Sequence, residues 1–195
     1  MNAVQKVFEE TGAYLRGHFR LTSGLHSGEY LQCALVLQHP EHAERCGKGI
    51  AEALGRLTGG NRVALVAAPA LGGVVIGHEV ARALGARFIF TERGADGKMT
   101  LRRGFTVAAG ETAVVVEDVV TTGGSTAEVI EILRNAGAQV LAAASIVDRS
   151  GGAVDLGIPR VALWTLNVVN YQPENCPMCR EGIPITKPGS RPTNA

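Results

Sequence analysis

The sequence predicts an α/β fold built on a doubly wound parallel sheet. From residue 63 onward, apolar runs of strand length alternate with segments of helical periodicity, which is the pattern of successive βα units. The runs Val63–Ala68 and Val140–Val147 are apolar at almost every position, as expected of strands that are buried on both faces of a sheet. Glycines follow several helical segments, where they can cap a helix with a left-handed backbone.

The chain before this pattern is expected to form a small N-terminal hood of residues 1–38. Met1–Arg16 has apolar residues on one helical face, which predicts an amphipathic helix. Gly17–Gln38 carries turn residues and is expected to be irregular or hairpin-like. A proline opens the next predicted helix, Pro40–Leu57, at a position that favours helix starts.

Residues 39–185 are expected to form the core domain, and residues 186–195, rich in proline and polar residues, a frayed tail. After its first helix the core is predicted to contain, in order, strand Val63–Ala68, loop Pro69–Gly73, a helix to Leu84 capped by Gly85, strand Arg87–Thr91, a polar loop or long hairpin Glu92–Gly104, strand Ala113–Val116, helix Thr126–Asn135 capped by Gly137, and strands Val140–Val147 and Val161–Leu166.

Composition narrows the possible functions. With 195 residues, 46% of them hydrophobic and 19% charged, the chain can bury one well-filled core. Its formal charge of +1 argues against binding to duplex nucleic acid, which depends on many basic contacts to phosphates. No signal peptide is visible, and no run approaches the ~18 apolar residues of a membrane span. We therefore expect a cytoplasmic protein with reduced thiols, no membrane partner and no nucleic-acid partner.

Cys176-Pro-Met-Cys179 has the spacing of half a zinc site. Zinc normally takes four ligands, and Cys33, Cys46 or the histidines could supply a second pair only through tertiary proximity. The simpler interpretation is a turn that happens to carry two thiols. The histidines have no obvious acid or serine partner in the sequence and are expected to be structural or exposed: His18, His26, His39, His42 and His78.

The stretch Val114–Ser125 carries the clearest chemistry. Its apolar run places Glu117 and Asp118 at the carboxyl end of a strand, where open α/β sheets bind ligands. The turn Thr121–Ser125 is rich in small and hydroxyl residues, so its backbone N–H groups can approach an anion at the start of the next helix.

The two acids need a separate explanation. Carboxylates beside a phosphate repel it, but they accept hydrogen bonds from neighbouring hydroxyls, so acids next to phosphate-binding amides indicate a ribose phosphate. Ser125-x-x-Glu128 also fits a capping box for the following helix. The alternative is an acidic surface turn before an ordinary helix. Neither a Gly-Lys-Ser/Thr P-loop nor a Gly-x-Gly-x-x-Gly fingerprint is present.

Glu117–Ser125 resembles the phosphoribosyl diphosphate (PRPP) signature of type I phosphoribosyltransferases. Roughly residues 3–185 are similar, more narrowly, to the orotate phosphoribosyltransferases of bacteria and archaea. The stretches that carry this narrower resemblance are Gly17–Gly24, Pro69–Gly73, Glu92–Gly104 and Ile146–Gly152, and Cys176–Gly182 is similar to one branch of the family.

The resemblance implies the type I phosphoribosyltransferase fold and a glycosyltransferase that moves a pentosyl group. PRPP and orotate would give orotidine 5′-monophosphate and pyrophosphate, a step of pyrimidine biosynthesis. Mg²⁺ is the implied cofactor, carried mainly by PRPP and not by a protein metal site. PRPP would bind to Glu117, Asp118, Val119, Val120, Thr121, Thr122, Gly123, Gly124 and Ser125, with the two acids on the ribose hydroxyls, and orotate would bind to Thr121 and Arg149.

Arg149 also fits orotate on chemical grounds. Orotate differs from uracil by a carboxylate, and a planar guanidinium can pair with a carboxylate through two hydrogen bonds. The alternative is a surface arginine that pairs with the neighbouring Asp148.

The charged loop Thr91–Gly104 has four basic and two acidic residues, a net charge of +2 (4 − 2). The resemblance implies a homodimer in which this loop closes over the neighbouring subunit's active site. Arg93 and Lys98 are the expected catalytic cations at the departing pyrophosphate; a solvated charged hairpin is the alternative. Lysines that are common in the family are missing at Thr22 and at Leu71-Gly72, which implies greater reliance on backbone amides, Mg²⁺ and the loop.

Two other functions remain open. A purine-base phosphoribosyltransferase would stack its base on an aromatic side chain, for which Phe19 and Tyr30 are the candidates. A PRPP-sensing regulator of the same fold would bind nucleic acid and should have a basic face, which the net charge does not favour. Pyrophosphate release with different bases separates the three functions.

Overall fold

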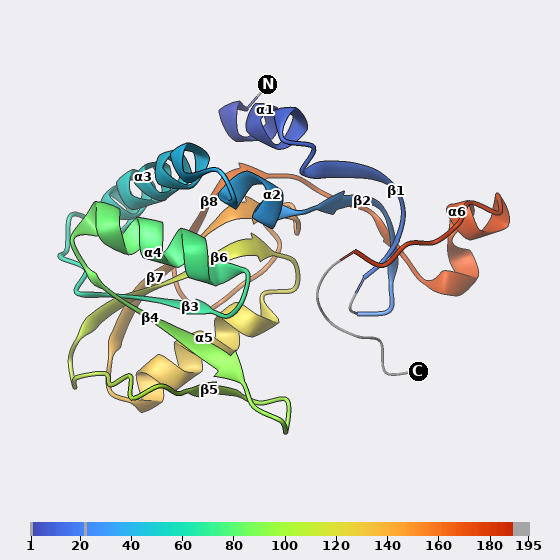
Figure 1. The fold of residues 1–195 in the computed structure, drawn as a ribbon. Coiled ribbons are helices and arrows are strands. Elements are labelled where there is room, and N and C mark those ends of the chain that lie inside the picture. The colour runs from blue at the N-terminus through green and yellow to red at the C-terminus, as the bar shows by residue number, and fades with distance from the viewer. Residues whose placement is uncertain (1, 22, 189–195) are drawn as a thin grey trace.

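The computed structural model describes residues 2–21 and 23–188. Its centre is a six-stranded sheet in the order β5-β4-β3-β6-β7-β8 (Figure 1). Its strands are β3 (Leu65–Pro69), β4 (Arg87–Arg93), β5 (Met99–Leu101), β6 (Thr112–Val120), β7 (Gln139–Asp148) and β8 (Arg160–Thr165). Neighbouring strands pair in parallel except β4 and β5, which form an antiparallel hairpin. The predicted doubly wound parallel sheet is therefore confirmed.

Helices cover both faces of this sheet. α3 (Pro40–Leu57) and α4 (Gly73–Leu84) lie on one face and α5 (Gly124–Asn135) on the other (Figure 1). The side chains of β6 alternate between the two layers: Val114 packs in the core with α3 and α4, and Val115 packs with α5. Both side chains are fully buried, and this two-sided burial is why residues 113–116 of the strand are all apolar.

Helix limits follow the prediction where the chain carries a strong local signal. α3 begins at Pro40 and ends at Leu57 as predicted. α4 ends at Leu84 and is capped by Gly85, whose φ of 63° is the left-handed backbone that a glycine cap supplies. Within residues 2–21 and 23–188, no helix combines the length and apolar character needed to cross a membrane.

The predicted strand Ala113–Val116 is longer in the structure. β6 continues to Val120 because Glu117 pairs with Ser145 of β7 and Val120 pairs with Asp148. The sequence predicts an end at Val116 because polar residues begin at Glu117, whereas the pairing with β7 continues past them. The acidic pair therefore lies in a hydrogen-bonded strand and not in a loop.

The hood contains α1 (Ala3–Glu10), β1 (Tyr14–Arg20), β2 (His26–Leu31) and α2 (Cys33–Leu37). The predicted helix Met1–Arg16 is wrong beyond Glu10, because the chain turns at Gly12, where φ is 65°, and then enters β1. The hairpin expected in Gly17–Gln38 is present, since β1 and β2 pair antiparallel.

Aromatic contacts join the hood to the core. The rings of Phe8 and Tyr14 stand edge-on to Trp164 of β8, at centroid distances of 5.7 and 5.6 Å. Edge-to-face pairs of this kind add to the burial of apolar area. The hood is therefore held against the outer strand of the sheet.

The C-terminal segment, residues 170–186, completes the hood. β9 (Asn170–Tyr171) pairs with β2 to give a three-stranded sheet in the order β1-β2-β9, and η1 (Pro173–Asn175) and α6 (Pro177–Arg180) follow. Thr186, the first residue of the predicted tail, bridges to Phe19. Residues 189–195 of that tail lie outside the described residues.

Candidate functional site

The acidic pair lies at the carboxyl end of β6, in the centre of the sheet. Glu117 is buried and Asp118 half-buried, and successive strand residues point to opposite faces. The backbone N–H of Val119 donates to Oδ1 of Asp118 over 2.9 Å. Burial raises the pKa of Asp118 above its ordinary value. A ligand that donates hydrogen bonds to this carboxylate would offset its loss of water.

The turn Pro69–Gly73, which follows β3, lies against Asp118. A Cβ atom on Gly72 would lie 2.7 Å from both carboxylate oxygens of Asp118, so only glycine fits there without a shift. The Ala70–Leu71 peptide is cis, and the Leu71 side chain is 79% exposed. An exposed apolar side chain thus stands where the resemblance leads us to expect a lysine. Thr22, the other such position, lies outside the described residues.

The turn Thr121–Ser125 connects β6 to α5. Its Gly123 is the N-cap of the helix, with φ of 75° and no side-chain cap. A Cβ atom there would lie 2.6 Å from Cγ1 of Val154, so both the backbone and the packing require glycine. Thr121 and Thr122 are exposed. The first N–H groups of a 12-residue helix therefore lie at an open turn, and this arrangement favours the binding of an anion.

The predicted capping box Ser125-x-x-Glu128 is wrong. The helix begins two residues earlier than a Ser125 cap requires, and Glu128 forms an ion pair with Arg93 of β4. The two guanidinium Nη atoms of Arg93 lie 3.0 and 2.7 Å from the Glu128 carboxylate oxygens. The carboxylate that would have capped the helix is engaged by a stronger, charge-assisted partner.

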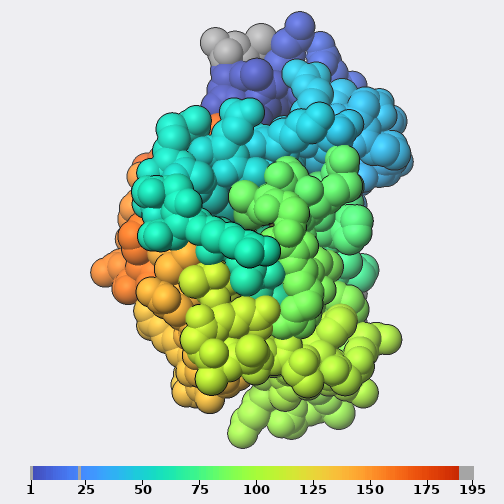
Figure 2. All heavy atoms as spheres, turned by 90° about the vertical axis from the view of Figure 1, so that its left-hand side faces the viewer, coloured from blue at the N-terminus to red at the C-terminus, as the bar shows by residue number. Residues whose placement is uncertain are grey.

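The two predicted catalytic cations of the charged loop lie in different surroundings. Nη2 of Arg93 lies 3.5 Å from Oγ of Ser125, so this charge is held beside the turn Thr121–Ser125 of its own chain. The β4–β5 hairpin lies at the lower edge of the molecule in Figure 1 and Figure 2. Lys98 lies between its two strands and is exposed. Arg103 pairs with Glu92 over 2.7 Å. Lys98 and Arg102 make no ion pair with any described residue.

Arg149 lies at the end of β7 and is only 7% exposed. Its Nη2 donates to Oγ of Ser27 over 3.2 Å and to the carbonyl of Glu29 over 3.1 Å. Its Nε is buried without a hydrogen-bond partner among the described residues, and burial lowers its pKa. A buried guanidinium held by neutral oxygens keeps its charge available for an anionic ligand.

The alternative pairing of Arg149 with Asp148 does not occur. Oδ2 of Asp148 lies 2.8 Å from Nη1 of Arg160, and its Oδ1 accepts from the Ser150 hydroxyl over 2.6 Å. Although burial alone would raise the pKa of Asp148, the hydrogen bonds from Ser150 and Arg160 hold it below its ordinary value. Asp148 therefore fixes the turn after β7, which carries Arg149.

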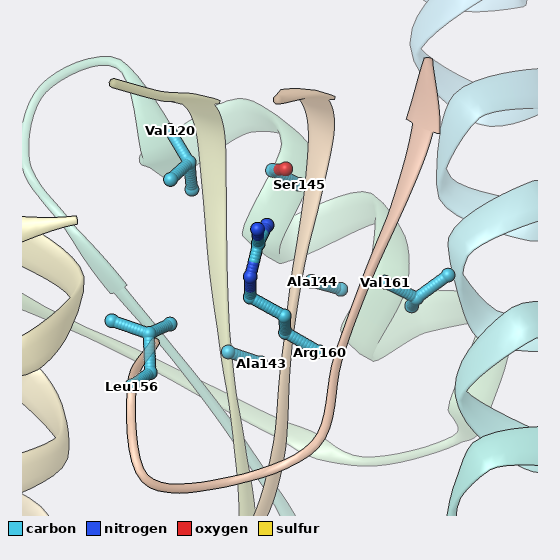
Figure 3. A pocket seen from close by; sticks show the side chains of 7 residues that line it. All are labelled: Val120, Ala143, Ala144, Ser145, Leu156, Arg160 and Val161. Carbon is cyan, nitrogen blue, oxygen red and sulfur yellow. The ribbon is translucent and has the colours of Figure 1, made fainter. Parts of the chain in front are cut away.

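Arg160 also lines a small cavity beside the site. In Figure 3 its guanidinium extends along β7 toward the carboxyl end of that strand. The lining residues are Val120, Ala143, Ala144, Ser145, Leu156, Arg160 and Val161. Only Val120 belongs to the segment Glu117–Ser125, so this cavity backs the site and is not the ligand position.

Three contacts at the site were not predicted. Ser27 and Glu29 reach Arg149 from β2, which is 120 or more residues away in sequence. Tyr30 lies on the same strand, and burial, with a smaller effect of Asp118, raises its pKa. Nothing local in the sequence marks Ser27 and Glu29 as partners of Arg149, because the hood contacts the core only in the folded structure. The approach of Gly72 to Asp118 has a weak signal in the paired glycines at 72 and 73.

Comparison with known proteins gives a consistent result. A family model described as "Phosphoribosyl transferase domain" matches residues 34–170. The chain is 54% identical over 185 residues to the orotate phosphoribosyltransferase of Pelotomaculum thermopropionicum, covering 95% of each chain. It is 53% identical over 188 residues to that of Heliobacterium modesticaldum, covering 96% of this chain and 97% of the relative. The crystal structure of orotate phosphoribosyltransferase from Aeropyrum pernix matches with a TM-score of 0.69 at 30% identity, covering 84% of this chain and 93% of that one.

Proposed function

The chain belongs to the phosphoribosyl transferase family, and we propose that it transfers the 5-phosphoribosyl group from PRPP to orotate, giving orotidine 5′-monophosphate and pyrophosphate. The observation that carries the choice of orotate is the buried guanidinium of Arg149, which has no acidic partner among the described residues. Two relatives named orotate phosphoribosyltransferase match nearly the whole chain. The reaction belongs to pyrimidine nucleotide biosynthesis.

PRPP is placed across the carboxyl end of β6. Glu117 and Asp118 accept hydrogen bonds from the ribose hydroxyls, which offsets the loss of water at the buried Glu117 and the half-buried Asp118. The amides and hydroxyls of Thr121–Ser125 surround the 5-phosphate at the positive end of α5. Arg93 supplies a fixed positive charge at the first turn of that helix.

Orotate is placed between Arg149 and Thr121. Its carboxylate pairs with the guanidinium, which is buried and therefore interacts strongly with an anion. Uracil lacks this carboxylate and would leave the cation unpaired. A purine would rely instead on stacking against Phe19 and Tyr30, whose ring centroids are 5.9 Å apart, and Arg149 would then have no partner.

The reaction requires no protein nucleophile. The deprotonated N1 of orotate forms a bond to the anomeric carbon while the bond from that carbon to the pyrophosphate oxygen breaks, so the ribose gains oxocarbenium character. The protein contributes positioning and electrostatic stabilisation. Lys98 neutralises the departing pyrophosphate, whereas Arg93, expected in the same role, is held by Glu128 beside the turn Thr121–Ser125. The hard carboxylate oxygens of Glu117 and Asp118 fit Mg²⁺ that arrives on PRPP, and the bound ion supplies charge neutralisation at the diphosphate.

We further propose a homodimer in which the charged loop Thr91–Gly104 closes over the neighbouring subunit's site. Two apolar side chains near the site are exposed, Leu71 at 79% and Val75 at 45%, and a second copy of the chain would bury them. Lys98 lies exposed on the β4–β5 hairpin, so it is available to a neighbouring subunit.

The cytoplasm is the proposed location. All four cysteines lie in the described part of the chain and none is in a disulfide, which fits a reducing compartment. The net charge of +1 fits small anionic substrates better than a nucleic-acid partner.

The proposal is tested with a panel of bases. The purified protein is incubated with Mg²⁺ and PRPP together with orotate, uracil, adenine or xanthine, and pyrophosphate release is followed. We expect release with orotate alone. Binding of PRPP without turnover of any base would contradict an enzymatic role. Turnover of a purine in place of orotate would show that the substrate is a purine base.

A further inference from the structure

Four potential metal ligands meet on the side of the hood. The ligand atoms of His18, His26, Cys176 and Cys179 all lie within 4.8 Å of one another. His18 belongs to β1, His26 begins β2, and the two cysteines belong to the α6 turn. All four residues fall outside the range 34–170 that the family model matches. The second ligand pair that the sequence does not show is therefore supplied by the hairpin of the hood.

The distances within this cluster are those of a tetrahedral site. Nε2 of His18 lies 3.0 Å from Nδ1 of His26, and the Sγ atoms of Cys176 and Cys179 lie 3.5 and 3.6 Å from Nε2 of His18. Sγ of Cys179 lies 3.3 Å from Nδ1 of His26. A tetrahedron with ordinary zinc bond lengths requires about 3.4 Å between two nitrogens and about 3.6 Å between nitrogen and sulfur. The four atoms are already arranged around one common centre.

The tautomer of His18 is fixed in the form that a ligand needs. Its Nδ1 lies 2.8 Å from the carbonyl oxygen of Ile183. Since a carbonyl oxygen can only accept, Nδ1 carries the hydrogen and Nε2 directs its lone pair at the cluster. A backbone carbonyl that orients a ligating imidazole is the usual outer contact of a metal site.

Burial distinguishes this cluster from a chance surface grouping. Cys176 is fully buried, His18 is 3% exposed and His26 is 7% exposed. Cys179 is exposed, so a metal ion has a path of entry. None of the four side chains has a role in the proposed transferase reaction.

We propose that His18, His26, Cys176 and Cys179 bind one structural zinc ion, which fastens the C-terminal segment to β1 and β2. Two thiols lose their protons as the sulfurs bind, and two thiolates with two neutral imidazoles balance the charge of Zn²⁺. Thiolate and imidazole ligands select zinc over the hard ion Mg²⁺. Four protein ligands leave no open coordination position, so the ion is structural and not catalytic.

The hydrogen bonds around the cluster indicate what the ion holds in place. Thr186 N donates to the carbonyl of His18, and Arg20 N donates to the carbonyl of Thr186, both over 2.8 Å. The residue after His26 is Ser27, which accepts from Arg149. The zinc ion therefore fixes the strand that positions Arg149. This last step rests on the proposed function, whereas the metal site does not.

The first test is the metal content of the full chain, produced without a tag and purified without chelators. We expect about one zinc per chain by plasma mass spectrometry. Cobalt added to chelator-treated protein should produce the visible bands of tetrahedral Co²⁺ and a thiolate-to-cobalt charge-transfer band. Less than a tenth of a zinc per chain after incubation with zinc sulfate and a reductant, with no cobalt bands, would overturn the proposal.

Matched variants locate the ion. Cys179→Ser, chosen because this side chain is exposed, should lose the zinc and the charge-transfer band, and Cys46→Ala should retain both. Equal zinc content in Cys179→Ser and the unaltered chain would contradict the site. Circular dichroism checks that each variant folds, and the cobalt spectrum of the unaltered chain decides the question without any variant.

Activity provides a separate measurement. Removal of zinc should raise the KM for orotate several-fold and change the KM for PRPP little, because β2 contacts Arg149. If the protein transfers no phosphoribosyl group at all, the proposed function fails, while the zinc content and cobalt spectrum still decide the metal site.

Discussion

Arg149 donates a hydrogen bond to Ser27 over 3.2 Å, although the two residues are 122 positions apart in the chain. This contact joins the end of β7 in the core to β2 in the hood. It holds a buried cation in one orientation without neutralising it, because the partner is a hydroxyl.

Replacing Arg149 should separate base recognition from PRPP binding. Arg149→Ala removes a buried, charge-assisted pair with orotate, so kcat/KM for orotate should fall on the order of 100-fold or more. The dissociation constant of PRPP, measured by calorimetry, should change less than about threefold. Arg134→Ala, an exposed arginine in the last turn of α5, serves as the control. Equal losses for both substrates would refute the role given to Arg149.

Gly72→Ala should disturb the acidic pair. The new Cβ would lie 2.7 Å from both carboxylate oxygens of Asp118, and the φ of −57° at Gly72 excludes backbone strain as the cause. We expect PRPP affinity to fall about tenfold, as for a lost hydrogen bond to a charged group. Gly55→Ala, inside α3 with open space around its Cβ, should instead stabilise the fold by about 0.5–1 kcal/mol. Unchanged PRPP affinity in Gly72→Ala would show that the turn can move away.

Asp118→Asn should weaken PRPP binding and raise the melting temperature. Burial raises the pKa of Asp118 in the folded chain, so the folded state holds this proton more tightly than the unfolded state. The resulting destabilisation is present above the folded pKa and disappears as pH falls below the unfolded value of about 4. Melting curves of variant and unaltered protein should therefore differ at pH 7 and converge toward pH 4. A difference in melting temperature that stays constant from pH 7 to pH 4 would contradict a raised pKa of Asp118 as its cause.

Mixing two inactive variants tests whether the charged loop acts across subunits. Lys98→Ala should lower kcat with little change in the KM for orotate, because Lys98 is exposed and outside the base site. Equal amounts of Lys98→Ala and Arg149→Ala, mixed and allowed to exchange, should recover about a quarter of full activity, since half the dimers carry one intact site. Gel filtration verifies the dimer. No recovery from exchanged dimers would place Lys98 in the site of its own chain.

The central sheet could be predicted from the sequence because its signals are local. Two-sided burial makes Val114 and Val115 both apolar, and Gly85 marks the end of α4. The same holds for the segment Glu117–Ser125, whose acids and small residues are consecutive. Even there the capping box failed, because Arg93 from another strand engages Glu128, and a sequence window around α5 does not contain that competitor.

The hood could not be predicted to the same depth, because its contacts join distant residues. β9 has only two residues, too few to carry a periodic pattern. Cys176 meets His18 across 158 positions, and the spacing of the cysteines alone shows only half of that cluster. Arg149 was found through its chemistry, whereas its partner on β2 had no sequence signal.

The pairing of β9 with β2 also sets an order for synthesis on the ribosome. The core strands β3 to β8 are complete by Thr165, while β2 must wait for Asn170–Tyr171 and β1 for Thr186. Chains generally fold from the N-terminus as they emerge, but here one of the first hairpins to appear is among the last to be secured. A chain that ended just after Thr165 would contain every strand of the central sheet, but its β1–β2 hairpin would lack both β9 and the bridge to Thr186.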